Sequence, residues 1–339
     1  MPKFPFPFHP IRESLYSSDE LVAGFDPARP ASYAETRDFR IYQQYVAAGR
    51  SAPSDYFPAM MQSLHDNSIT LATHEYLASS CAKAVGIMGG HDLDRDSPAY
   101  QKVARLAYAL ARQGFMLLSG GGPGAMEATH LGALLQHEGE ESLETALAEL
   151  AAQPRLPENL KNVIDPDGHL DEALVVQAHA WMLPAWRILK RTQKPGESLA
   201  IPTWLYGHEP TSPFATHIAK YFQNSIREEG LLAVASHGVI YAEGRAGTLQ
   251  EIFQDANQNF YRLFGNFSPM TFYGAAYWTR QIPAVPVLQA LFAPVDFARY
   301  VLVTDDPGEI VDFVLRHREP ESPSERLGRY IEKKEVGRS

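Results

Sequence analysis

The chain has 339 residues, of which 45% are hydrophobic and 21% are charged, so a disordered or collagen-like chain is excluded. Lys and Arg total 30 against 40 for Asp and Glu, which gives a formal charge of −10. No run of basic residues offers a surface to a phosphate backbone, and nucleic acid is therefore not expected as a partner.

The cysteine content and the hydropathy point to a cytoplasmic protein. A single cysteine, Cys81, excludes an internal disulfide framework and a Cys-rich zinc site, and it favours a reducing compartment. No apolar run approaches the roughly 18 residues that a membrane helix needs, and prolines interrupt the start MPKFPFPFHP where a signal peptide would be apolar. We expect no membrane partner.

Residues 1–81 are predicted to form a helical N-terminal extension. They combine proline-broken segments with two stretches of helical periodicity, at 35–49 and 56–80, and they contain no convincing strand.

From residue 82 to about residue 320, short apolar runs alternate with longer amphipathic stretches. The predicted strands are 84–88, 115–119, 199–202, 238–242, 270–273 and 300–304. The helices predicted to follow them are 99–113, 125–136, 214–236, 248–261, 285–292 and 307–317. This alternation predicts a parallel sheet with helices on both faces, a doubly wound, Rossmann-like α/β fold. Residues 138–196, approximately, read as a helical insertion that could cover a site, and 321–339 as a polar tail.

The second predicted strand ends in a glycine-rich turn, SGGGPGAME (119–127). Consecutive glycines allow positive φ and a close approach to a ligand, and a helix starting near Ala125 would direct its free N–H groups there. An anion or a ribose would suit such a turn, although a tight turn without a ligand is equally compatible with the pattern. The candidate binding residues here are Gly120, Gly121, Gly122, Gly124 and Met126.

A second glycine-rich turn, EGRAGTLQE (243–251), follows the run GVIYA. Gly244 and Gly247 give the backbone freedom, Thr248 offers a hydroxyl or a helix cap, and Glu251 lies one turn into the helix. The alternative is structural, because Thr248 and Glu251 have the spacing of a capping box. Two such turns in one sheet predict facing walls of a phosphate and ribose pocket.

The two motifs in this order resemble the LOG (Lonely Guy) family of nucleotide phosphoribohydrolases, some of which carry the label lysine decarboxylase. The GGG-x-x-G-x-M turn of that family falls on residues 120–126, and its PGG-x-GT-x-x-E loop falls on residues 243–251. The resemblance covers residues 82–318, approximately. Residues 1–80 and the insertion are not part of the compact versions, so the chain is similar to the longer bacterial members.

The resemblance implies hydrolysis of the N-glycosidic bond of a nucleoside 5′-monophosphate to a free base and ribose 5-phosphate, and assembly as a homodimer or a higher homo-oligomer. The catalytic glutamate of the family falls on Glu251. Its catalytic arginine falls near 227–228, where strict counting gives Glu228 and the residue type selects Arg227. The expected substrate-binding residues beyond the first turn are Gly89, Gly90, Gly244, Arg245, Ala246, Gly247 and Thr248.

The residue types suit this chemistry. A carboxylate at Glu251 can stabilise an oxocarbenium-like ribose or orient the attacking water. Backbone N–H groups of residues 244–248 suit the 5′-phosphate. Arg227 can hold phosphate or ribose oxygens, or form a solvated pair with Glu228 or Glu229 instead.

Glu243 and Arg245 depart from the proline and glycine of the family motif. Arg245 could neutralise Glu243 or contact the phosphate directly. If its side chain filled the pocket instead, hydrolysis would be in doubt.

Two further segments are weaker candidates. The loop HDLDRD (91–96) carries aspartates that are typical of a solvated loop, so no metal is expected, and no lysine has a setting that suggests pyridoxal phosphate or another cofactor. PTWLYGHEP (202–210) places aromatic and polar residues at the rim, where a ring could stack a base or pack against the insertion. These residues are Trp204, Tyr206, His208 and Glu209.

Two other functions remain open from the sequence. One is a non-catalytic nucleotide-binding or sensor protein on the same fold, in which the residues at 243 and 245 mark lost hydrolysis. The other is transfer of the ribosyl group to another base.

Overall fold

The computed structural model describes residues 5–53, 55–80, 83–165, 167–261, 268–292 and 299–317. In this part of the chain seven strands form one sheet in the order β4-β3-β2-β1-β5-β6-β7, and every neighbouring pair is parallel. Cys81, the boundary proposed at 81–82 and the proposed polar tail lie outside the described residues.

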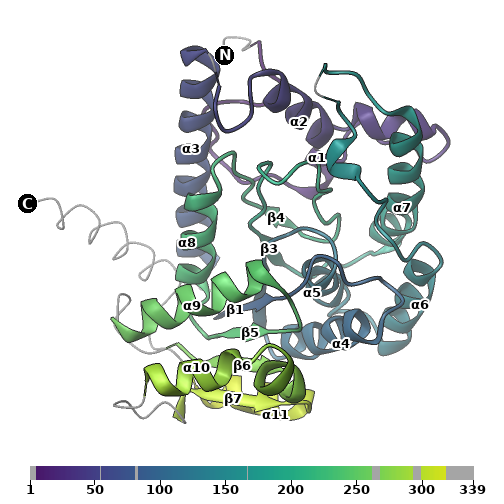
Figure 1. The fold of residues 1–339 in the computed structure, drawn as a ribbon. Helices are drawn as coiled ribbons and strands as arrows, with labels where there is room; N and C mark the ends of the chain where they lie inside the picture. Colours follow the sequence, from purple (N-terminus) through teal and green to yellow (C-terminus); the bar gives the residue numbers. More distant parts are fainter. Residues whose placement is uncertain are drawn as a thin grey trace, which may run out of the picture.

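From β1 onward, helices lie between successive strands except between β3 and β4, which a segment without a helix connects (Figure 1). The strands are β1 (Lys83–Met88), β2 (Phe115–Ser119), β3 (Ser198–Ala200), β4 (His217–Ile218), β5 (Val239–Tyr241), β6 (Met270–Tyr273) and β7 (Val301–Thr304). The α-helices before the sheet are α1 (Ser18–Leu21), α2 (Arg37–Ala47) and α3 (Tyr56–Ser80). The α-helices that follow β1 in the chain are α4 (Pro98–Arg112), α5 (Ala125–Leu134), α6 (Glu140–Ala151), α7 (Glu172–Arg191), α8 (Asn224–Val234), α9 (Ala246–Phe260), α10 (Ala284–Leu291) and α11 (Pro307–Arg316). Short helical turns are η1 (Pro30–Glu35), η2 (Leu160–Asn162) and η3 (Tyr277–Gln281).

Helices cover both faces of the sheet, because successive residues of the central strand β1 pack into two different cores. Val85 and Ile87 of β1 pack with residues of α4, α5 and α11 in one core. Ala84 and Met88 of the same strand pack with residues of α8, α9 and α10 in the other. A parallel strand buried on both sides reads as a continuous apolar run, which is why the sequence indicated these strands. The predicted doubly wound α/β fold is confirmed.

The prediction of one helix over residues 214–236 is wrong in its first half. His217 and Ile218 instead form β4, which pairs with Leu199 and Ala200 of β3, and α8 begins only at Asn224. On its other side Ile218 exchanges backbone hydrogen bonds of 2.9 and 3.0 Å with Tyr16 of the N-terminal region. These pairings at the sheet edge, made by distant segments, outweigh the local helical periodicity.

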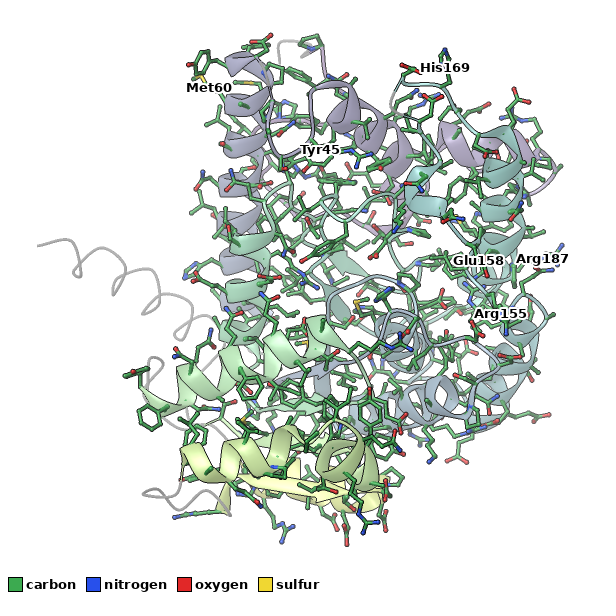
Figure 2. All side chains as sticks on the ribbon, viewed as in Figure 1. Tyr45, Met60, Arg155, Glu158, His169 and Arg187 are labelled. Carbon is green, nitrogen blue, oxygen red and sulfur yellow. The ribbon has the colours of Figure 1, made fainter. Side chains whose placement is uncertain are left out.

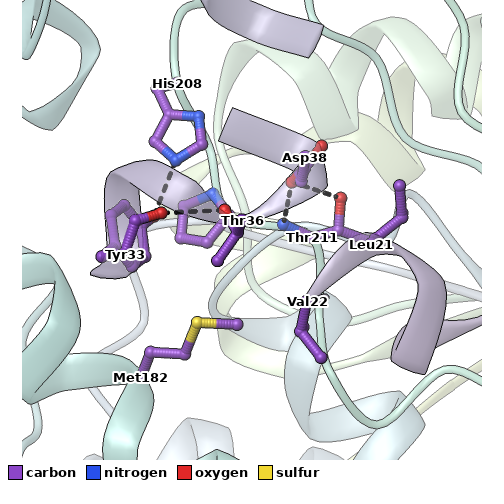
Figure 3. A pocket seen from close by; sticks show the side chains of 9 residues that line it. Leu21, Val22, Tyr33, Thr36, Asp38, Met182, His208 and Thr211 are labelled. Atoms are coloured by element: carbon purple, nitrogen blue, oxygen red, sulfur yellow. Dashed lines mark hydrogen bonds between the residues drawn. The ribbon is translucent and has the colours of Figure 1, made fainter. Parts of the chain in front are cut away.

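The N-terminal helices pack onto the β3–β4 end of the sheet around a buried ion pair. The ammonium of Lys220 lies 2.8 and 3.0 Å from the two carboxylate oxygens of Asp38. Trp204 Nε1 and the Thr211 hydroxyl also donate to Asp38, at 2.9 and 3.1 Å. The adjoining cavity, at His208, has a volume of about 10 Å³, enough for about one water molecule (Figure 3). This cluster therefore holds the N-terminal helices in place and offers no ligand site.

Arg95, from the HDLDRD segment, fastens the insertion to the sheet. Its guanidinium donates to both carboxylate oxygens of Glu127 on α5, at 2.6 and 2.8 Å, and to the carbonyl of Trp181 on α7, at 2.7 Å. The guanidinium also lies 3.7 Å from the centre of a Trp181 ring. Tyr100 donates a further hydrogen bond of 2.9 Å to Glu127. All of these side chains are buried, so Arg95 has a structural role. The aspartates around it in the HDLDRD segment had indicated only a solvated loop.

The long helix α3 presents an apolar face to solvent. Met60 is 59% exposed, whereas Tyr45 on α2 is buried in the interior (Figure 2). Phe57, Leu64 and Leu71 are also exposed and share one side of the helix with Met60, because their spacing follows the helical repeat. No helix in the described ranges combines the length and the hydrophobicity that crossing a membrane requires.

Candidate functional site

The loops after β1, β2 and β5 meet at the carboxyl edge of the sheet. The strand order reverses here, because β2 lies on one side of β1 and β5 on the other, and such a point is the usual ligand site of doubly wound folds. The Gly90 N–H donates to the carbonyl of Glu243 at 2.9 Å, and the Gly90 carbonyl accepts from Ala125 N–H at 3.0 Å. These two hydrogen bonds place Gly89 and Gly90 between the two glycine-rich motifs.

The first glycine-rich turn needs glycine at several of its positions. Gly121 and Gly124 have φ of +71° and +70°. A Cβ at Gly120 would lie 2.6 Å from the Met126 sulfur and would collide with the guanidinium of Arg227. The missing side chain at Gly120 therefore allows Arg227 and Met126 to lie directly against the turn.

A buried polar chain beneath this turn was not anticipated from the sequence. The Ser119 hydroxyl accepts from Gly121 N–H at 3.1 Å and lies 2.8 Å from His130 Nε2. His130 Nδ1 lies 2.9 Å from the hydroxyl of Ser198 on β3. Burial lowers the pKa of His130 to about 3, so its ring is neutral at physiological pH and links two hydroxyls without carrying a charge. The only sequence feature that could have indicated this buried chain is the presence of two polar residues, Ser119 and His130, in otherwise apolar segments.

Arg227, and not Glu228, faces the turn. Its guanidinium lies 3.9 Å from the Glu251 carboxylate, and its Nε donates to the carbonyl of Ile201 at 3.0 Å. The side chains of Arg227 and Glu251 are only 11% and 13% exposed. Glu228 turns the other way and accepts hydrogen bonds from Tyr206, Asn224 and Gln250. The structure thus brings together the two residues that the resemblance singled out as catalytic.

The environment of Glu251 disfavours its charge. Burial is the main reason that the pKa of Glu251 is raised to about 7; Arg227 lowers this pKa and Glu228 raises it, both by less than burial does. Near neutral pH the carboxyl group therefore exists in both protonation states. A perturbed carboxyl next to a guanidinium in a cleft is typical of functional sites.

This pKa shift predicts a pH-dependent stability difference between Glu251→Gln and the wild type. A carboxyl group whose pKa rises on folding contributes stability below its unfolded pKa, 4.5, and that stability is lost as the pH rises through about 7. Gln cannot ionise, so the variant should gain on the order of 2–3 kcal/mol relative to wild type between about pH 4.5 and about pH 8. Denaturation measured across this range tests it. A stability difference that stays constant with pH would contradict the assignment.

The capping interpretation of Thr248 is wrong. Helix α9 begins at Ala246, and its N-cap is Arg245, which makes no side-chain cap hydrogen bond. Thr248 and Glu251 lie inside the helix and cannot form a capping box at its start. The N–H groups of Ala246, Gly247 and Thr248 belong to the first turn, where no intrahelical acceptor exists, so this helix end suits an anion.

Gly244 packs tightly at this helix start. A Cβ there would lie 2.8 Å from the Cβ of Thr248 and 2.9 Å from the backbone nitrogen of Gly90. The Tyr277 hydroxyl donates to the Gly244 carbonyl at 2.7 Å and holds the loop from the other side.

Arg245 takes neither of the roles considered for it, since it pairs with Asp92 and not with Glu243. The ion pair of Arg245 is with Asp92, at 3.5 Å, and the Arg245 side chain is 81% exposed. Glu243 is exposed and lies beside Gly274. Arg245 therefore neutralises a carboxylate of the β1 loop and does not fill the site.

The rim segment 202–210 divides into buried and site-facing residues. Trp204 and His208 are buried against the N-terminal helices, so stacking of Trp204 on a base is excluded. Tyr206 is 52% exposed, and its hydroxyl donates to Glu228 at 3.2 Å. A carboxylate oxygen of Glu209 lies 3.3 Å from where a Cβ of Gly122 would be. Glu209 is therefore the member of this segment that reaches the glycine-rich turn, whereas Tyr206 lies with Glu228, which faces away from that turn.

The acidic loop after β1 does not gather metal ligands. Asp92 pairs with Arg245, and Asp94 pairs with Arg155 at 3.0 Å. Among the described residues, one group has ligand atoms that all lie within 4.8 Å of one another, namely the exposed Asp165, Asp167 and His169. That group lies on the insertion and shares no residue with the glycine-rich turns.

Fold and site together define a doubly wound α/β protein with two glycine-rich turns and an arginine–glutamate pair where the strand order reverses. Residues 82–139 match a protein-family model described as the SLOG cluster4 family, and the SLOG superfamily includes LOG-like proteins. The matched segment contains the first glycine-rich turn and ends before Arg227 and Glu251.

Two of the solved structures that are similar to this chain are described as molybdenum cofactor proteins. The molybdenum cofactor binding protein of Rippkaea orientalis is 14% identical with a TM-score of 0.39, over 69% of this chain and 96% of that chain. The Moco carrier protein of Chlamydomonas reinhardtii is 15% identical with a TM-score of 0.39, over 69% of this chain and 98% of that chain. The sequence matches no curated protein.

Proposed function

We propose that the protein hydrolyses the N-glycosidic bond of a nucleoside 5′-monophosphate and releases a free base and ribose 5-phosphate. The observation that carries this proposal is the largely buried pair of Arg227 and Glu251, 3.9 Å apart, with Arg227 packed against Gly120. The start of α9, with its free N–H groups, lies one helical turn from Glu251.

Each part of the site has a role in this reaction. The 5′-phosphate binds at the N–H groups of residues 246–248, and its binding energy orients the ribose. Arg227 holds ribose or phosphate oxygens. As the bond from C1′ to the base breaks, the base keeps the bonding electrons, and the Glu251 carboxylate stabilises the positive charge on the ribose. Water then adds to C1′, and its proton passes to the carboxylate or the base.

The side chain of Arg245 leaves the pocket open to a ribose, which both hydrolysis and simple nucleotide binding require. A guanidinium inside the pocket would have occupied the space of the ribose, whereas Arg245 lies outside and pairs with Asp92. The non-catalytic nucleotide-binding protein stays the alternative, because Glu243 and Asp92 place carboxylates near a phosphate site.

We further propose a cytoplasmic homodimer, or a multiple of it. This rests on the family resemblance and on the exposed apolar side of α3, formed by Phe57, Met60, Leu64 and Leu71, which a second copy of the chain would cover.

The first test compares a nucleoside monophosphate with its nucleoside. If the start of α9 binds the phosphate, AMP or another monophosphate should be cleaved while the corresponding nucleoside is nearly inert, since the nucleoside lacks the group that orients it. Release of free base is the measurement. Equal turnover of AMP and adenosine would contradict a phosphate site at residues 246–248.

A pair of glycine variants locates this phosphate site. Gly244→Ala would push the loop away from Gly90 and Thr248, whereas Gly139→Ala meets no atom within 4 Å and serves as the control. We expect KM to rise by about tenfold or more in Gly244→Ala, equivalent to ~1.4 kcal/mol of binding, and to stay unchanged in Gly139→Ala.

A further inference from the structure

A second cavity, of about 290 Å³, opens at the carboxyl ends of β5, β6 and β7, against the start of α4. Glu243, Tyr273 and Asp305 line it from the strand ends. Ser97 and Lys102 line it from α4 and its N-cap. Neither Arg227 nor Glu251 belongs to its lining, and no residue of the Gly120–Gly124 turn does. The cavity therefore borders the site of the proposed hydrolysis through Glu243 but contains neither member of its arginine–glutamate pair, and it gives a role to the Glu243 side chain.

The cavity contains polar groups without partners in the described part of the chain. Tyr273 is only 7% exposed, and its hydroxyl has no hydrogen-bond partner among those residues. Burial raises the pKa of Tyr273, and so does Asp305, so the hydroxyl keeps its proton and can donate. Within the same ranges, neither Glu243 nor Lys102 forms an ion pair.

The charges in the lining have both signs and come from different elements. Glu243 and Asp305 suit an ammonium group, and Asp305 is fixed by a hydrogen bond of 3.0 Å from Ala275 N–H. Lys102 suits a carboxylate, and α4 begins beside it with Ala99 N–H in its first turn. Ser97 caps Tyr100 N–H at 3.2 Å, which leaves Ala99 N–H for a ligand.

From this arrangement we propose that the cavity binds a small zwitterion, a compound with one ammonium and one carboxylate group. The ammonium lies between Glu243 and Asp305, and the carboxylate lies at Lys102 and the start of α4. The volume of about 290 Å³ is at the lower end for ligand pockets, which limits the ligand to a small metabolite. The Tyr273 hydroxyl donates to the ligand and completes its own hydrogen bonding.

Calorimetric titration of the full chain with free L-α-amino acids tests the proposal, with butylamine and butyrate as probes that carry one charge each. At least one amino acid should bind about tenfold or more tightly than either single-charge probe. The readout is heat of binding, so it does not depend on nucleotide hydrolysis and can succeed or fail independently of it.

Three variants assign the lining residues. Glu243→Gln and Lys102→Met should each weaken binding of that amino acid about tenfold, or ~1.4 kcal/mol. Asp312→Asn removes an exposed carboxylate of α11 outside the lining and should change nothing. Thermal melts check that each variant is folded. The proposal is overturned if no amino acid binds better than butylamine and butyrate, or if Glu243→Gln and Lys102→Met both bind as wild type does.

Discussion

Glu251→Gln should bind nucleoside monophosphates with nearly wild-type affinity and lose on the order of a hundredfold or more in turnover. The substitution keeps the size and the hydrogen-bonding capacity of the side chain and removes only the negative charge. That charge acts mainly when the ribose becomes positive, so its loss affects the transition state more than substrate binding. Turnover and nucleotide affinity must therefore be measured on the same preparation.

A matched variant separates this effect from a general loss of charge. Glu75→Gln neutralises an exposed glutamate near the end of α3, just before β1 enters the sheet, and thus at the edge opposite the site. It should retain full turnover. A Glu251→Gln protein within a few-fold of wild-type turnover would return Glu251 to a structural role and favour the nucleotide-binding alternative.

Arg95→Met should cost about 3–5 kcal/mol of unfolding free energy. The substitution leaves the Glu127 carboxylate in the interior with only the Tyr100 hydroxyl as a close donor among the contacts described, and a buried charge without its partner is strongly destabilising. It also removes the hydrogen bond to the Trp181 carbonyl, which holds α7 of the insertion. Chemical denaturation measures the loss.

The double variant Arg95→Met with Glu127→Gln identifies the cause. It removes the uncompensated charge, so it should recover a substantial part of the lost stability. If Arg95→Met alone lowered the unfolding free energy by less than about 1 kcal/mol, which is typical of a surface ion pair, the Arg95–Glu127 pair would not hold the insertion on the sheet. If the double variant were no more stable than Arg95→Met, packing and not charge would explain the loss.

The sheet was predictable because its strands are buried on both faces. The runs 115–119 and 270–273 coincide with β2 and β6, since continuous apolar segments of strand length carry a clear signal. β4 carried no such signal. It has two residues, and its outer pairing is with Tyr16, some 200 residues away in the chain, which no local pattern encodes.

The positions of the site's loops could be predicted from the sheet topology. The directions of individual side chains could be predicted less well. Residues that follow parallel strands must lie at one edge of the sheet, and this is where the glycine-rich turns and Glu251 lie. The direction of Arg227 relative to Glu228 depends on where α8 begins, and that follows from β4. The pairing of Arg245 with Asp92 depends on the approach of the β1 and β5 loops, which is a tertiary contact.

The most direct test of the proposed function is a titration of purified protein with a panel of nucleoside 5′-monophosphates, with binding and ribose 5-phosphate release measured side by side. The account predicts that at least one nucleotide binds and yields ribose 5-phosphate and free base in equal amounts, and that turnover rises with pH through about 7 as Glu251 ionises. Nucleotides that bind but release no ribose 5-phosphate at any pH would contradict it and would identify a binding protein instead.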